Sequence, residues 1–174
     1  MKKIILTLAT VIGALCTGTE ANAQRSGDIA LGLRATPDGG GFTAKFYTGR
    51  HWAVETQLNA GGIFGGNGES FNIVGLAEYH INLPDPSWQL FLGGGLHAGV
   101  WDRPGSARWN GDRYYWDDDA DPLFGIDAIG GVQYSFKSIP LSLSADMKPA
   151  FNFVPDPDPF WHNFLGLSAR FYIR

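Results

Sequence analysis

The sequence predicts an all-β protein, an eight-stranded antiparallel up-and-down transmembrane β-barrel that follows a cleavable signal peptide. Apolar and polar residues alternate with a period of two along most of the chain, and the period of an amphipathic helix is nearly absent. The alternating segments exceed the roughly five or six residues usual for strands in soluble sheets. The connections between them are alternately short and long, which is typical of bacterial transmembrane barrels.

The N-terminal segment has the features of a signal peptide. Lys2 and Lys3 precede an apolar run, and Ala21-Asn22-Ala23 supplies the small-x-small pattern after which a signal peptidase cuts. We therefore expect residues 1–23 to be removed and residues 24–174 to form an outer-membrane β-barrel domain. Cys16 is the one cysteine of the chain, so its removal with the leader leaves no disulfide, zinc–cysteine site or cysteine nucleophile.

Composition excludes several other classes of protein. The formal net charge of −4 provides no electrostatic footprint for nucleic acid. After the leader, no apolar run approaches the length of a transmembrane helix. The 24 glycines follow no three-residue period, which excludes collagen, and the 14% aromatic content argues against disorder.

Each strand is recognised, in chain order, by its alternating apolar residues. The expected strands are 27–36, 41–48, 51–61, 70–82, 87–101, 122–136, 139–153 and 161–174. Their apolar phases include Ile29, Leu31 and Leu33; Phe42, Ala44 and Phe46; Trp52, Val54 and Leu58; Phe71, Ile73 and Ile81; Leu90, Leu92 and Leu96; Phe124, Ile126 and Val132; Leu141, Leu143 and Met147; and Leu165, Leu167 and Ile173. Pro149 removes a ladder donor from the seventh strand, so we expect a bulge or an upper-rim position there.

The connections assign the two ends of the barrel. The longer ones, 37–40, 62–69, 102–121 and 154–160, follow the odd strands, and the shorter ones, 49–50, 83–86 and 137–138, follow the even strands. Turn-forming runs such as Pro84-Asp85-Pro86 and Pro155-Asp156-Pro157 fall between strands. Because short turns are periplasmic in such barrels, we expect both termini on the periplasmic side.

The phase opposite to the apolar one carries charges that balance. No charge occurs on the apolar phase, whereas the opposite phase carries four basic and four acidic residues: Arg34, Lys45, Lys148 and Arg170, with Glu55, Glu78, Asp127 and Asp146. Gly32, Gly93, Gly95, Gly125 and Gly131 lie on the same phase. We interpret these charges as a luminal network that plugs the barrel, since an eight-stranded barrel is just filled by its side chains. A gated narrow pore that opens when the ion pairs rearrange is the alternative.

Alternation alone does not say which face is inside, because a soluble lipocalin-like barrel would keep the apolar face inward. Three observations favour the membrane arrangement. The charged phase is sparse and neutral, unlike an ordinary water-facing surface. The chain ends within a strand, at Phe171-Tyr172-Ile173-Arg174. Aromatic residues of the apolar phase also gather at the expected periplasmic ends, where a girdle at headgroup level is typical: Phe46, Trp52, Tyr79, Trp88, Tyr134, Phe136 and Phe171.

In this pattern, topology and aromatic terminal strand, residues 24–174 resemble the small eight-stranded outer-membrane barrels of the outer membrane protein A/X type of Gram-negative bacteria. The resemblance implies a lumen filled by paired charges and a structural, adhesive or host-interaction role. It also implies that the barrel-assembly machinery recognises the terminal strand, although Arg174 stands where an aromatic residue is commoner. Surrounding partners would then be outer-membrane lipid and lipopolysaccharide, and we expect a monomer without a cofactor.

Enzymatic chemistry has little support in the residues. His80 and His97 lie on the luminal phase, where we interpret them as hydrogen-bonded interior histidines. Barrels that resemble lipid A deacylases carry serine and histidine on the lipid-facing side, and this apolar face has neither. Acyltransferase-like relatives need an apolar interior, which the charges contradict. His162 could still meet Asp156, Asp158 or Ser106 at the outer rim, so a lipid A-modifying enzyme remains the third possibility, after a soluble ligand-binding barrel in the periplasm or outside the cell.

The longest loop, 102–121, has the composition of a binding patch, because it combines aromatic side chains with arginines. The candidate interaction surface is Arg108, Trp109, Arg113, Tyr114, Tyr115, Trp116, Asp117, Asp118 and Asp119. The carboxylates lack the spacing of a calcium-binding loop, so we predict no metal site and interpret them as a solvated acidic loop. Bridging through divalent ions to lipopolysaccharide phosphates is a hypothesis, as is direct contact of the arginines with those phosphates.

Overall fold

The described part of the chain is built entirely of strands and their connections. The computed structural model describes residues 27–61, 69–102, 107–109, 114–116, 121–154, 158–160 and 164–173. The strands are β1 (Ile29–Thr36), β2 (Gly39–Tyr47), β3 (Trp52–Gly61), β4 (Glu69–Asn82), β5 (Trp88–Asp102), β6 (Ala107–Trp109), β7 (Tyr114–Trp116), β8 (Asp121–Ser135), β9 (Leu141–Met147), β10 (Ala150–Val154), β11 (Asp158–Phe160) and β12 (Leu165–Ile173).

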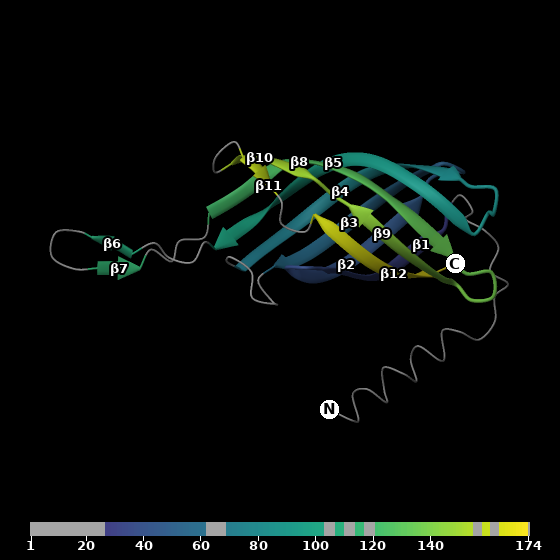
Figure 1. The fold of residues 1–174 in the computed structure, drawn as a ribbon, viewed down its shortest axis with the longest axis horizontal. Coiled ribbons are helices and arrows are strands. Elements are labelled where there is room, and N and C mark those ends of the chain that lie inside the picture. The colour runs from purple at the N-terminus through teal and green to yellow at the C-terminus, as the bar shows by residue number, and fades with distance from the viewer. Residues whose placement is uncertain are drawn as a thin grey trace, which may run out of the picture.

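The main sheet closes on itself (Figure 1). Neighbouring strands pair antiparallel in the order β1, β2, β3, β4, β5, β8, β9 and β12, and β12 returns to pair with β1 from Ile29↔Ile173 to Ala35↔Leu167. This arrangement confirms the predicted eight-stranded up-and-down barrel. Each of these eight described strands thus has a neighbour on both sides, which is the condition for strands to cross a bilayer.

The two ends of the barrel differ in their connections. One end, which we call the turn end, carries the turns 48–51, 83–87 and 136–140 together with the last residue of β12. The other, the loop end, carries the connections after β1, β3, β5 and β10. The first of these is shorter than predicted, because Gly39 and Gly40 pair with Thr36 and Ala35 and leave Pro37 and Asp38 as the turn. The longest connection contains the β6–β7 hairpin, which Figure 1 shows beyond the loop end.

The seventh strand of the barrel has no bulge at Pro149, which was one of the two arrangements expected there. β9 and β10 form a single strand along β8, and its register is constant from Gly130↔Met147 to Asn152↔Gly125. The backbone N–H of Ala128 donates to the Pro149 carbonyl over 2.9 Å. The bulge therefore does not occur at Pro149, as one of the two expectations had it, but between Asn152 and Val154. Pro149 lies next to the point where pairing with β12 stops, at Leu165↔Met147.

The eighth strand differs from its predicted bounds. β12 begins at Leu165, whereas the sequence predicts a strand over 161–174. The segment Asp158–Phe160, which the sequence assigns to the connection 154–160, forms β11 and pairs with β10 near the loop end. Pro159 within β11 fits such a position, because proline is tolerated on strands whose outer edge needs no donor.

The strands of the barrel wall place apolar side chains outside and polar side chains inside, as expected of a membrane protein. Large apolar side chains are exposed, with Leu33 at 60%, Leu167 at 65% and Phe42 at 68%. Among strand residues whose side chains are described, none of the exposed ones is charged. The apolar phase therefore faces outward, opposite to the arrangement of a lipocalin-like barrel.

Aromatic contacts ring the turn end. The Trp52 and Tyr79 ring centroids are 5.3 Å apart, and Tyr134 lies 4.8 Å from Trp88 and 4.9 Å from Phe136. Phe46 is exposed on the same end. These pairs have the separations of favourable aromatic contacts, and they place the predicted girdle residues in neighbouring strands.

Candidate functional site: the charged lumen

The lumen holds the eight charged residues singled out in the sequence, and every one of them is buried: Arg34, Lys45, Glu55, Glu78, Asp127, Asp146, Lys148 and Arg170. Burial of an isolated charge is strongly unfavourable, so each needs a partner. The structure distributes the eight among three separate groups, each of which contains equal numbers of cations and carboxylates.

The largest group lies toward the turn end. Lys45 Nζ is 2.9 Å from Glu55 Oε2 and 2.7 Å from Glu78 Oε2. Arg170 Nη2 is 2.7 Å from Glu55 Oε1. Lys45 and Glu55 are directly opposite in the β2–β3 ladder, whereas Arg170 reaches Glu55 from β12. Two cations and two carboxylates thus join β2, β3, β4 and β12.

Neutral side chains complete this group. The Thr43 hydroxyl donates to Glu55 over 2.7 Å, and the Gln57 amide donates to the same carboxylate over 2.8 Å. Arg170 also donates to Thr43 and to Ser144. Hydrogen bonds of this kind are needed if ion pairing is to offset the desolvation of buried charges.

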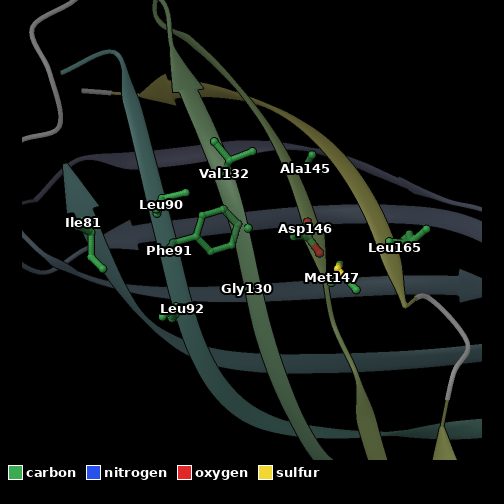
Figure 2. A pocket seen from close by; sticks show the side chains of 11 residues that line it. Ile81, Leu90, Phe91, Leu92, Gly130, Val132, Ala145, Asp146, Met147 and Leu165 are labelled. Carbon is green, nitrogen blue, oxygen red and sulfur yellow. The ribbon is translucent and has the colours of Figure 1, made fainter. Parts of the chain in front are cut away.

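Lys45 also contacts an aromatic ring, that of Phe91. Its Nζ is 4.5 Å from the centroid of the Phe91 ring, within the range of a cation–π contact. The Phe91 ring stacks on His80 at 5.5 Å, and His80 Nε2 lies 3.1 Å from Glu78. Figure 2 shows Phe91 and Asp146 projecting from β5 and β9 on either side of β8 at Gly130. His80 is therefore the hydrogen-bonded interior histidine that the sequence predicted.

The second group is the ion pair between Arg34 of β1 and Asp146 of β9. β12 lies between these strands, with Ser168 opposite Arg34 and Gly166 opposite Asp146. A Cβ atom on Gly166 would overlap the Arg34 guanidinium. The glycine thus creates the space through which Arg34 crosses to its partner.

The third group lies nearer the loop end. Lys148 Nζ is 2.5 Å from Asp127 Oδ1, and His97 Nδ1 is 2.7 Å from Asp127 Oδ2. The other ring nitrogen of His97 lies 2.9 Å from Asn152 Oδ1. Gly125 makes room for this imidazole, because a Cβ there would be 2.6 Å from His97 Cε1.

Sequence reasoning missed a polar cluster at the turn end. Gln133 contacts the hydroxyls of Tyr47 and Tyr172 and the hydroxyl of Ser135, at 3.2 to 3.4 Å. These residues share the luminal phase of their strands, which is the signal that could have identified them. The prediction of luminal residues depended on charge, and these residues are uncharged, so they were not predicted.

Several predicted features lie outside the described residues or have no described side chains. These are the leader 1–23, the rim residues Ser106, Asp156, Asp158 and His162, and the loop surface Arg108, Trp109, Arg113, Tyr114, Tyr115, Trp116, Asp117, Asp118 and Asp119. Within the described residues, no cluster of three or more histidine, cysteine, aspartate or glutamate side chains could hold a metal ion. No helix in the described part of the chain is long and apolar enough to span a bilayer.

Comparison with solved structures identifies the fold. The N-terminal β-barrel domain of Pseudomonas aeruginosa OprF matches this chain with a TM-score of 0.64, at 11% identity, over 86% of this chain and all of that domain. The fold is that of an OprF-type outer-membrane barrel. No protein-family model and no curated relative matches the sequence. The resemblance between this chain and OprF therefore lies in strand number, closure and topology.

Proposed function

We propose that this protein is a monomeric integral barrel of the bacterial outer membrane, with a lumen plugged by its ion pairs and with a structural or loop-mediated interaction role. One observation carries the proposal: an uncharged apolar wall surrounds a set of buried charges that balance within three groups. Water would not favour such a wall, whereas a bilayer does. The OprF-type fold supports the same location.

Localisation follows from this proposal. Residues 1–23 act as the signal peptide, the barrel-assembly machinery inserts residues 24–174, and the turn end faces the periplasm. Outer-membrane phospholipid and lipopolysaccharide surround the wall. The proposed role needs neither a cofactor nor an enzymatic activity, and it is supported by the oppositely charged partner of each buried luminal cation.

Membrane fractionation tests the location. We expect the protein in the outer-membrane fraction, and we expect its gel mobility after detergent extraction to change on boiling, because a folded barrel resists unfolding in detergent. A soluble periplasmic protein whose mobility is the same before and after heating would contradict the proposal.

Conductance measurements test the plug. The barrel in planar bilayers should show no sustained open state, because each luminal cation already has a carboxylate partner. Frequent opening of the unaltered protein would instead support the narrow gated pore.

The loop surface is the proposed contact for an extracellular partner. Replacing Arg108, Trp109, Tyr114 and Tyr115 together should abolish adhesion of cells that display the protein. The heat-dependent gel shift should stay unchanged, because these residues lie outside the barrel wall. Unaltered adhesion would remove the loop from the proposal.

A further inference from the structure

One cation at the turn end differs from the other described cations. Five lysine and arginine side chains of the described residues form an ion pair with a carboxylate: Arg34, Lys45, Lys137, Lys148 and Arg170. Arg50, in the turn between β2 and β3, is exposed and has no such partner in the described residues. The four buried cations need partners because they are removed from water, whereas the exposed guanidinium of Arg50 is hydrated and is therefore available to an anion supplied from outside.

The surroundings of Arg50 are those of a membrane interface. His51, the next residue, stacks on Tyr79 with ring centroids 5.5 Å apart, and Tyr79 contacts Trp52 edge-on. His51 Nδ1 lies 3.0 Å from the His80 carbonyl oxygen, which fixes the ring against β4. Aromatic rings of this kind lie at headgroup level in membrane barrels. In the membrane orientation proposed above, Arg50 would therefore lie at the height of the phosphate groups of the periplasmic leaflet.

An apolar groove lies further from the turn end, along this hairpin and the adjoining strand β1. Its volume is about 400 Å³. The small side chains of Ala44 and Thr56, which are opposite each other in the ladder, are among those that line it. Larger apolar side chains border it: Leu31, Leu33, Phe42 and Leu58.

The groove lies within one lipid leaflet of the turn end. Ala44 is three residues from the end of β2 at Tyr47, which corresponds to ~10 Å at ~3.4 Å per residue. Half of the hydrocarbon core is ~15 Å thick. A chain that starts from a phosphate at Arg50 therefore reaches the groove within its own leaflet.

We propose that the β2–β3 hairpin binds one glycerophospholipid of the periplasmic leaflet, with its phosphate on Arg50 and an acyl chain in the groove over Ala44 and Thr56. Charge complementarity supports this occupant, because the guanidinium is suited to bidentate phosphate contact. The proposal rests on the membrane location proposed above.

Other parts of the wall provide matched controls. The groove of Figure 2, about 480 Å³, lies over Gly130 and Ala145 and is likewise apolar. At the turn end Lys137 is also exposed, but its Nζ lies 3.3 Å from Asp85 Oδ1. Lys137 therefore already has an anionic partner. Lys137 is the control for Arg50, because both are exposed cations at the turn end, and Ala145 is the control for Ala44, because both are small residues that line an apolar groove.

The experiment measures binding of dipalmitoyl phosphatidylglycerol to the detergent-folded full barrel by native mass spectrometry. Arg50→Gln should weaken binding about tenfold, since it removes a charge-assisted contact, and Lys137→Gln should leave it unchanged. Ala44→Leu, which fills the groove, should weaken binding of the long-chain lipid while Ala145→Leu does not. Equal losses in both members of either pair, or no loss with Arg50→Gln or Ala44→Leu, would overturn the proposal.

The same samples separate this proposal from the proposed function. Each variant is run on gels with and without boiling, and fractionated with the outer membrane. Loss of the heat-dependent shift in the unaltered protein would reject the membrane barrel itself. A normal shift without preferential lipid binding would reject the phospholipid site alone.

Discussion

At the scale of single residues, glycines decide where the luminal charges can lie. A Cβ on Gly166 would overlap the Arg34 guanidinium, and a Cβ on Gly93 would be 2.4 Å from the backbone carbonyl oxygen of Ala77. By contrast, a Cβ on Gly75, on the outer face, would meet no atom within 4 Å. A side chain at Gly93 would thus clash with the backbone, and one at Gly166 would require the Arg34 side chain to shift.

Gly166→Ala should destabilise the barrel by about 1–3 kcal/mol, because the added methyl group forces the buried Arg34 guanidinium to shift from its place against Asp146. Urea titration of the detergent-folded protein measures the change in free energy of unfolding. Gly75→Ala is the matched control and should change that free energy by less than about 1 kcal/mol. Equal effects of the two substitutions would show that the luminal position of Gly166 is unimportant.

Lys45 bridges two luminal carboxylates, those of Glu55 and Glu78. Lys45→Met should cost about 3–5 kcal/mol, because it leaves excess buried negative charge. Adding Glu78→Gln should recover part of that loss, since it restores charge balance within the group. Urea midpoints of the single and double variants give the coupling, and additive losses would argue against an interacting group.

At the scale of elements, the β4–β5 turn is held by the side chain of Asp85. Its carboxylate accepts a hydrogen bond from the Ser87 backbone N–H over 3.0 Å and contacts Lys137 in the neighbouring turn. The hydrogen bond from the Ser87 backbone, followed by the Ser87 side chain and Lys137, lowers the pKa of Asp85 below its ordinary value. The ionised form is therefore the one that the folded turn favours.

The pKa shift of Asp85 predicts a pH dependence. Because the folded-state pKa is the lower one, the stabilisation is present above the unfolded pKa of about 4 and is lost as pH falls through the folded pKa. The difference in unfolding free energy between the unaltered protein and Asp85→Asn should shrink as pH is lowered from about 6 to about 3. A difference that stays constant across this range would contradict the role of the carboxylate.

At the scale of the whole molecule, the outward apolar wall can be tested by measuring how a charge placed on it changes the free energy of unfolding in lipid vesicles. Leu92, on the outer face of β5, is 61% exposed. In lipid vesicles Leu92→Arg should lower the free energy of unfolding by roughly 2–4 kcal/mol, the cost of a cation near the bilayer midplane. Ser138→Arg, exposed in the turn 136–140 at the turn end, should cost about 0–1 kcal/mol. Similar costs at both sites would contradict a membrane-spanning wall.

Most of the barrel could be predicted because its determinants are local. Strand phase follows from alternation, so the inward positions of Lys45 and Glu55 were readable along the chain, and their pairing follows from one hairpin. The extra pairing of β11 and the bulge at Asn152 were not readable, because they depend on how far neighbouring strands extend at the loop end. The Gln133 cluster was missed because uncharged polar residues carry a weaker signal.

The sequence by itself determined that eight strands alternate, which face of each is apolar, and that the luminal charges balance. Only the tertiary structure decided which charge meets which. Arg34 and Asp146 are 112 residues apart and come together because β12 closes the sheet against β1 and β9. Arg170 reaches Glu55 for the same reason, from a strand at the far end of the chain. The register of closure sets these pairings, and no local pattern encodes it, because it depends on all eight strands at once.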